Sequence, residues 1–378
     1  MSSIERARRR DSQELLRLWE DCILRNRFDK GWNELQSHIF ACESFDPYPH
    51  CLISKDAGKI MAAVAALPMT LRIGGIDVDA AVITGVATLP EARGRGHMRA
   101  LMDAAHRSMS DADQPLGLLW GHRDLYHRFG YELCGRKSKY YIPARKFSEP
   151  SSEQVCRIRE LDPVRDTKLV RGLAGQGNLR LPNLAQDSVL RALQRARHKT
   201  YIYDDKDAAA MVTTAHPPEA GTKLLEIYHA AGPWASVLAV LNHLMRDTGC
   251  MECAIHNDPL AAELDRNLFH FHEWKHDEHL ANVRINNLPR LMEKLEPLLL
   301  PNLRELGLSL RLAMDGTAQE WRTPAQPRTI AGSYSRPELT RLLFGPERPS
   351  ELPFIPAGDR LLNAVFPLPL YVIPCEGI

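Results

Sequence analysis

Apolar positions in the first 145 residues follow two spacings, one typical of strands and one typical of amphipathic helices. Four stretches have strand character: residues 51–54, 60–72, 78–88 and 116–120. The Gly74-Gly75 pair between two of them predicts a hairpin. Helical spacing predicts helices over about 12–23 and 96–110, and a short helix is expected around 123–128. With short strands near Ile4 and from Tyr131, this order predicts a mixed α/β domain.

A weaker form of the same order follows over residues 151–280, which indicates a degenerate internal repeat of the first domain. Within it, residues 269–274 are expected to form a strand. The last stretch is rich in proline and opens with a predicted strand at 283–285 and a helix over 288–299. We therefore expect an α/β (α+β) fold with two similar domains in tandem and a third domain after them. The expected domains are 1–147, 148–280 and 281–378.

Charge is balanced over the 378 residues, with 48 Lys and Arg against 47 Asp and Glu and a formal net charge of +1. This balance leaves no global electrostatic footprint for nucleic acid, so a charged ligand must be held by a local site. The basic run from Arg6 to Arg10 is short, lacks interleaved aromatic residues and is offset by Asp11 and Glu14. We interpret it as a solvated turn, and no nucleic-acid partner is expected.

Membrane and metal signals are weak. The longest apolar run, residues 60–69, contains a proline and is far too short to span a bilayer, and the N-terminus has no apolar segment of signal-peptide length. A cytoplasmic protein without membrane contact is expected. The 8 cysteines are scattered, and the close pair Cys250 and Cys253 lacks a second Cys/His pair at metal spacing. Free thiols and no metal are therefore expected.

Residues 272–276, His-Glu-Trp-Lys-His, are a literal H-E-x-x-H, the pattern of zinc metallopeptidases. Zinc binding by this pattern requires a helix, so that both imidazoles share a face. Because residues 269–274 alternate between apolar and polar positions, a strand is expected there instead. A zinc site is not expected at this motif.

The clearest chemistry lies between Val86 and Met102, where a strand ends, a Gly/Arg-rich loop follows and a helix begins. Exposed N–H groups at a helix N-terminus make an anion site, and glycines let a phosphate approach closely. Arg93 and Arg95 would add charge-assisted hydrogen bonds, so a diphosphate is the natural ligand. The alternative is a solvated basic turn that caps the helix. The sequence has no P-loop pattern, and the Rossmann G-x-G-x-x-G fails because Arg99 stands at its third glycine.

This junction resembles the Gcn5-related N-acetyltransferases (GNAT), whose R/Q-x-x-G-x-G/A loop binds the pyrophosphate of acetyl-CoA. Arg93-x-x-Gly96 matches that loop, although Met98 stands in its final small position. Downstream, residues 125–132, Leu-Tyr-His-Arg-Phe-Gly-Tyr-Glu, match the closing segment of the family, a tyrosine followed by R-F-G-Y/F. The two motifs in this order and spacing imply an acetyl-CoA-dependent N-acetyltransferase.

Over nearly its full length the chain resembles the enhanced intracellular survival (Eis-type) subgroup of this family. That subgroup combines a GNAT domain that has both motifs, a GNAT-like domain that lacks them and a C-terminal domain similar to sterol carrier proteins. Residues 283–292 resemble the opening of the third domain, and residues 335–345 and 361–373 resemble its later helix and final strand. The resemblance also implies a ring-like homo-oligomer such as a hexamer.

The resemblance assigns roles to individual residues. The strand whose backbone would pair with the pantetheine arm contributes Val86, Ala87 and Thr88. The loop that would hold the pyrophosphate consists of Arg93, Gly94, Arg95, Gly96, His97 and Met98. Gly121 and His122 would lie beside the thioester. Tyr126 would be the general acid, with a packed core tyrosine as the alternative, and the carboxylate of Ile378, or else Glu376, would act as base or substrate anchor.

Acetyl transfer to an amine requires an unprotonated nucleophile and a proton for the leaving thiolate. A tyrosine hydroxyl, with an ordinary pKa of about 10, is close to a thiol and donates that proton efficiently. An aminoglycoside-, polyamine- or lysine-like acceptor is expected. The aromatic and acidic residues that suit such a cationic amine are Phe28, Asp29, Trp32, Glu34 and Glu376. Two other functions stay open: an acyl-CoA-binding regulatory protein without turnover, and lipid carriage by the C-terminal domain.

Overall fold

The computed structural model describes residues 3–24, 32, 36–40, 45–173, 179–180, 193, 198–216, 223–257, 262–316, 318–355 and 360–372. The chain divides into two compact units. The first combines the residues up to Gly135 with His279–Leu370, and the second combines Arg136–Glu278 with a short stretch from Tyr371. The first unit joins residues of the expected first and third domains, and the three-domain division stays a prediction.

The first unit is built on a sheet with the strand order β1-β2-β3-β4-β5-β13. Its strands are β1 (Ser3–Arg6), β2 (Cys51–Asp56), β3 (Lys59–Ile73), β4 (Ile76–Thr88), β5 (Leu116–Leu119) and the last part of β13 (Trp274–Ile285). The antiparallel pairing of β3 with β4 confirms the predicted hairpin. Gly74 and Gly75 in its turn both have positive φ, 54° and 88°, which a tight two-residue turn requires.

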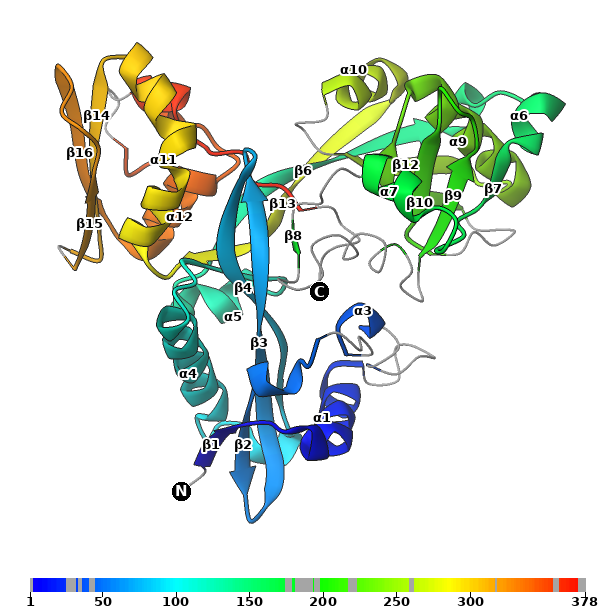
Figure 1. Cartoon of the computed structure of the whole chain (residues 1–378). Coiled ribbons are helices and arrows are strands. Elements are labelled where there is room, and N and C mark those ends of the chain that lie inside the picture. The colour runs from blue at the N-terminus through cyan, green and yellow to red at the C-terminus, as the bar shows by residue number, and fades with distance from the viewer. Residues whose placement is uncertain are drawn as a thin grey trace. The chain divides into compact units, whose positions relative to one another are not determined.

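Helices α1 (Ser12–Trp19) and α4 (His97–Asp111) lie on opposite sides of the β3–β4 hairpin (Figure 1). α4 connects β4 to β5, which run parallel. The α4 residues that pack against the sheet are Leu101, Met102, Ala105 and Met109, at the spacing that predicted the helix. α1 ends earlier than expected, and a π-helical turn (Glu20–Leu24) follows it. Short helices α3 (Ser37–Phe40) and α5 (Arg123–Tyr126) complete this part.

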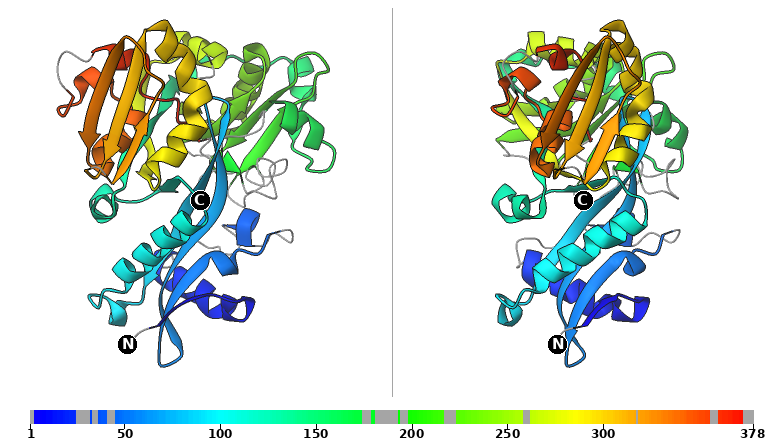
Figure 2. Two further views of the ribbon diagram at one scale, coloured as in Figure 1. Left: turned by 60° about the vertical axis from the view of Figure 1, so that its left-hand side comes forward. Right: turned by 90° about the vertical axis from the view of Figure 1, so that its left-hand side faces the viewer.

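The remainder of the first unit follows β13 and packs α11 (Leu288–Glu305) against a second sheet with the order β15-β14-β16 (Figure 2). Its other elements are β14 (Leu308–Met314), β15 (Gln319–Arg322), β16 (Arg328–Tyr334) and α12 (Arg336–Phe344). The strand expected over 361–373 does not form in its described part. Residues Arg360–Ala364 make a 3₁₀ turn, and Pro367 and Pro369 lack the N–H groups that a strand ladder requires. The likeness to sterol carrier proteins stays a prediction.

The second unit has the sheet order β6-β12-β11-β10-β9-β7. Its strands are β6 (Glu132–Pro143), β7 (Ile158–Glu160), β9 (Lys199–Tyr203), β10 (Ala210–Thr214), β11 (Leu224–Ala231) and β12 (Glu252–Asn257), with a short β8 (Leu179–Arg180). Helix α9 (Trp234–Thr248) connects the parallel strands β11 and β12, as α4 connects β4 and β5. A Cβ at Gly232, before α9, would lie 2.6 Å from the carbonyl oxygen of Ala209. The backbone of this turn therefore has no free space beside it for a ligand, unlike the backbone of the loop before α4.

The prediction of a strand over 269–274 is wrong for its first half. Helix α10 (Ala262–Phe271) extends through Phe271, and β13 begins at Trp274. Leu264, Leu268 and Phe271 all pack into the core of the second unit at helical spacing, and this burial outweighs the local alternation. The H-E-x-x-H pattern thus begins directly after α10 and continues into β13, so its two histidines do not share a helical face. The second unit also contains α6 (Ser152–Cys156) and α7 (Thr167–Leu173).

Candidate functional site

The strands β4 and β5 separate at one end of the first sheet. Their parallel pairing covers Ala80–Val82 with Leu116–Leu118, while β4 continues along β3 as far as Thr88. The last six residues of β4 therefore lie beyond this pairing. A strand edge without a partner presents N–H and C=O groups to a ligand. This separation opens the sheet next to the start of α4.

A bulge bends β4 within this open stretch. Ala63 pairs with Ala87 and Ala65 with Thr84, so Val64 alone faces two residues of β4. One of the two, Gly85, has a positive φ of 59°, as expected for a bulge built on glycine. The indole N–H of Trp19 donates to the carbonyl oxygen of Gly85 over 2.6 Å, and a Cβ at Gly85 would lie 2.6 Å from the Trp19 ring. Backbone conformation and packing thus both require glycine here.

The loop before α4 exposes the N-terminus of that helix. Gly94 and Gly96 have φ of 76° and 83°, in the left-handed region that favours glycine. Gly96 is the N-cap, and no side-chain hydrogen bond caps the helix there. Because the N–H of Ala100 donates to Gly96, the N–H groups before it have no carbonyl partner within the helix. With the helix dipole, these groups make an anion site.

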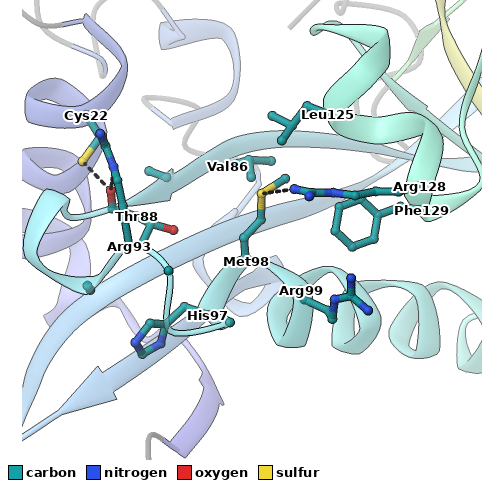
Figure 3. A pocket seen from close by; sticks show the side chains of 14 residues that line it. Cys22, Val86, Thr88, Arg93, His97, Met98, Arg99, Leu125, Arg128 and Phe129 are labelled. Carbon is teal, nitrogen blue, oxygen red and sulfur yellow. Dashed lines mark hydrogen bonds between the residues drawn. The ribbon is translucent and has the colours of Figure 1, made fainter.

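A cavity of about 450 Å³ lies where the end of β4, this loop and α4 meet (Figure 3). Its lining residues are Cys22, Val86, Ala87, Thr88, Ala92, Arg93, Gly94, Gly96, His97, Met98, Arg99, Leu125, Arg128 and Phe129. None of these residues is acidic, and three are arginines. The guanidinium of Arg128 lies over the Phe129 ring, 5.3 Å from its centroid, and its Nη2 is 4.0 Å from Sδ of Met98. The cavity wall thus combines three arginine side chains with apolar residues such as Leu125 and Phe129.

Most residues predicted to hold acetyl-CoA line this cavity, although their role in binding stays a prediction. They are Val86, Ala87, Thr88, Arg93, Gly94, Gly96, His97 and Met98. Nε of Arg93 donates to the carbonyl oxygen of Thr88 over 3.3 Å. The imidazole of His97 is buried, with Nδ1 2.9 Å from Oγ of Ser54. Arg95, Gly121 and His122 do not line the cavity.

Six lining residues were not predicted: Cys22, Ala92, Arg99, Leu125, Arg128 and Phe129. Arg99 lies in the first turn of the predicted helix, which was a usable signal. Arg128 and Phe129 belong to the closing motif, but the motif gave them no separate role. Cys22, whose Sγ donates to the carbonyl oxygen of Thr88 over 3.6 Å, had no sequence signal because 66 residues separate the two.

Tyr126 ends α5 between two lining residues but does not itself line the cavity. Its side chain is 8% exposed and meets Tyr131 edge to face, with ring centroids 6.4 Å apart. A Cβ at Gly121 would lie 2.5 Å from the Tyr126 ring, so glycine is required beneath it. Burial raises the pKa of Tyr126, which keeps its hydroxyl protonated. The role of Tyr126 as general acid stays a prediction.

Glu132 holds α5 in place. This buried carboxylate accepts from Nε and Nη2 of Arg123 over 2.6 and 2.8 Å, and from the N–H of Leu133 over 2.9 Å. Hydrogen bonds from Arg123 and Leu133 outweigh desolvation and lower the pKa of Glu132. The bidentate pair ties the first residue of α5 to the first residue of β6.

Other predicted residues lie elsewhere. Ile378 and Glu376 fall outside the described residues, as do Phe28, Asp29 and Glu34. Trp32 is 5% exposed and packs on Trp19, with ring centroids 5.2 Å apart. Its buried Nε1 has no hydrogen-bond partner in the part of the chain that the structure describes. The contact of Trp32 with an acceptor stays a prediction.

Acid is expected to destabilise the first unit through His106 of α4. Its Nε2 lies 3.3 Å from the Tyr131 hydroxyl, and burial with the charges of Arg284 and Arg336 lowers the pKa of His106 from 6.5 to about 3. At pH values between about 3 and 6.5, His106 binds a proton in the unfolded chain but not in the folded protein. Stability therefore falls as the pH drops below 6.5. From pH 7 to pH 5 the loss from this residue is about 1–2 kcal/mol. Urea unfolding at both pH values should show a smaller loss in His106→Gln, and an equal loss would contradict this origin.

Comparison with known proteins places this site in a family. Residues 3–134 match the family model described as an acetyltransferase (GNAT) domain, a range that includes every residue lining the cavity. The predicted GNAT domain is thus confirmed. GNAT acetyltransferases use an acyl-CoA as cosubstrate and an amine as acceptor. No curated protein gives a significant sequence match.

Solved structures with the same fold match nearly the whole chain. A probable N-acyltransferase from Enterococcus faecalis V583 has a TM-score of 0.72 at 15% identity and covers 98% of this chain and 99% of its own. A GCN5-related N-acetyltransferase from Anabaena variabilis has a TM-score of 0.67 at 18% identity, covering 99% and 98%. Eis1 from Mycobacterium abscessus has a TM-score of 0.63 at 13% identity, covering 99% and 98%. These likenesses confirm the α/β fold class. None of the described helices has the length and apolar character needed to cross a bilayer.

Proposed function

Since residues 3–134 form a GNAT acetyltransferase domain, we propose that this protein transfers the acetyl group of acetyl-CoA to a primary amine. The observation that carries the proposal is the arginine-lined cavity at the uncapped N-terminus of α4, beside the open edge of β4. An extended, anionic thioester cosubstrate suits both parts of this arrangement.

The two ends of acetyl-CoA would use different features of the cavity. Free N–H groups of the loop and of the first turn of α4 would hold the pyrophosphate, aided by Arg93, Arg99 and Arg128. The amides of the pantetheine arm would pair with β4 beyond Val82, where pairing with β5 has ended. Arg95, Gly121 and His122 are proposed as further contacts of acetyl-CoA, although they do not line the cavity.

In the reaction, the neutral amine attacks the thioester carbon and the tetrahedral intermediate then expels the CoA thiolate. A backbone N–H on the open edge of β4 would stabilise the oxyanion. Tyr126, which is protonated at neutral pH, would give its proton to the thiolate. The carboxylate of Ile378, or that of Glu376, would take the surplus proton of the amine.

The acceptor is proposed to be a cationic amine of the aminoglycoside, polyamine or lysine class, with Trp32 and Glu376 as contacts. We further propose a cytoplasmic homo-oligomer, such as a hexamer, with a sterol-carrier-like C-terminal domain. Light scattering on the purified chain tests the assembly.

A second candidate is an acyl-CoA-binding regulatory protein without turnover. The observation that favours it is the position of Tyr126, which does not line the cavity. Under this alternative the protein binds acetyl-CoA, but no amine increases thiol release.

The deciding experiment incubates the full chain with acetyl-CoA and a panel of polyamines, aminoglycosides and lysine peptides, and measures free thiol. We expect amine-dependent release with at least one class, matched by an acetylated product of the corresponding mass. Calorimetric binding of acetyl-CoA with no release above background would refute the transferase and support the regulatory alternative. Failure to bind acetyl-CoA would refute both.

A further inference from the structure

Strand β13 runs beside β5 and reaches the chain segment that follows it. Asn282–Ile285 of β13 pair antiparallel with Leu116–Leu119 of β5. β5 leads directly into Gly121, α5 and the turn that ends at Phe129. Although about 160 residues separate them in sequence, β13 and this segment are therefore neighbours in the first unit.

Two side chains of β13 bind backbone carbonyl groups of that segment. Nδ2 of Asn282 donates to the oxygen of Gly121 over 2.8 Å, and Nε of Arg284 donates to the oxygen of Phe129 over 2.9 Å. Residues two apart on a strand project from the same face. The indole N–H of Trp120 adds a third contact, donating to the oxygen of Leu280 over 3.0 Å. One face of β13 thus holds the segment at both of its ends.

The two carbonyl groups flank Tyr126. Gly121 lies directly beneath its ring, where a Cβ would come within 2.5 Å. Phe129 lines the cavity. A shift of either end therefore moves the Tyr126 hydroxyl relative to the cavity or changes the cavity wall.

The chemistry of both side chains indicates a dedicated contact. Asn282 is 1% exposed, and its buried Oδ1 has no hydrogen-bond partner among the described residues, so its Nδ2 contact with Gly121 must offset part of the cost of burial. Among the described residues, no carboxylate forms an ion pair with Arg284, which instead donates to Phe129 and to Oδ1 of Asn286. Burial and the nearby charge of Arg336 lower the pKa of Arg284 to about 10. Each group gives up solvation to donate to a specific oxygen.

We infer that Asn282 and Arg284 are positioning residues that fix the segment from Gly121 to Phe129, and with it Tyr126, against the acyl-CoA cavity. The inference rests on the proposed transferase function. Under this inference β13, the strand that leads into the C-terminal part of the chain, supports the reaction centre. Misplacement of a reacting group by about 1 Å is enough to lower a rate by about 10²-fold.

The kinetic test uses Asn282→Ala and Arg284→Met in the full chain. Asn282→Ala should lower kcat about tenfold with the KM for acetyl-CoA within about twofold, because the phosphate loop is untouched. Arg284→Met should also raise the KM for acetyl-CoA, since Phe129 is part of the cavity wall. Arg284→Lys keeps one donor and should recover most of that loss. Kinetics equal to wild type in both Asn282→Ala and Arg284→Met would overturn the inference.

A control separates positioning from general damage. Asn242 of α9 is also a buried asparagine, 8% exposed, and its Oδ1 accepts from the N–H of Ser148 in the second unit. Asn242→Ala should leave kcat unchanged. An equal fall of kcat in Asn242→Ala and Asn282→Ala would show that loss of stability explains both.

Hydrogen exchange tests the inference independently of turnover. Amides of residues 121–130 should exchange about tenfold faster in Asn282→Ala and Arg284→Met than in wild type or Asn242→Ala. Unchanged exchange would overturn the positioning role. If the wild-type protein binds acetyl-CoA but acetylates no amine, the transferase proposal fails, while the exchange result still decides whether β13 fixes the segment.

Discussion

Replacing Tyr126 with phenylalanine is expected to lower kcat for acetyl transfer by about 10²-fold or more, with the KM for acetyl-CoA changed less than about twofold. The substitution removes only the hydroxyl, which the proposed mechanism assigns as the proton donor for the leaving thiolate. Binding should persist because Tyr126 does not line the cavity that would hold the CoA moiety. Steady-state kinetics with acetyl-CoA and the best amine of the panel measures both constants.

Tyr131→Phe is the matched control. Tyr131 is the neighbouring buried tyrosine, and its hydroxyl lies beside His106 rather than at the cavity. We expect its kcat to stay within about threefold of wild type. A kcat for Tyr126→Phe that equals the wild-type value would remove Tyr126 from the mechanism and leave it as a packed core residue.

Gly85→Ala is expected to destabilise the first unit by about 2–6 kcal/mol and to raise the KM for acetyl-CoA. A left-handed φ of 59° costs a non-glycine residue about 1–3 kcal/mol. The new methyl group would also overlap the Trp19 ring, and overpacking costs about 1–3 kcal/mol more. The indole must then move, and the bulge that bends β4 at the cavity moves with it. Urea unfolding and acetyl-CoA titration measure the two effects.

Gly58→Ala separates these two causes. Gly58 has a comparable φ of 84°, but a Cβ there would meet no atom within 4 Å. Gly58→Ala should therefore lower stability only by the cost of the left-handed φ, and it should bind acetyl-CoA normally. Equal losses of stability in the two variants would show that the contact with Trp19 contributes nothing.

Local signals in the sequence were enough for the elements that frame the site. The periodicity of residues 96–110 predicted α4, Gly74-Gly75 predicted the β3–β4 turn, and the Gly/Arg-rich loop predicted an open helix N-terminus. Each depends on neighbours within a few residues, through hydrophobic spacing, glycine conformations or unpaired N–H groups. The two motifs also identified the GNAT domain, because the loop and the closing segment lie at family-specific positions.

Side-chain directions and long-range partners were decided only by the tertiary structure. His97 turns from the loop to Ser54, Cys22 reaches Thr88, and Asn282 reaches Gly121 across 161 residues. The strand expected over 269–274 failed because burial of α10 in the second unit overrode a local alternation. Short-range patterns in the sequence were thus enough to predict the likeness of residues 3–134 to a GNAT domain, the elements that frame the site and a candidate anion site. Which groups surround Tyr126, and what holds it, depends on packing between segments that no local pattern connects.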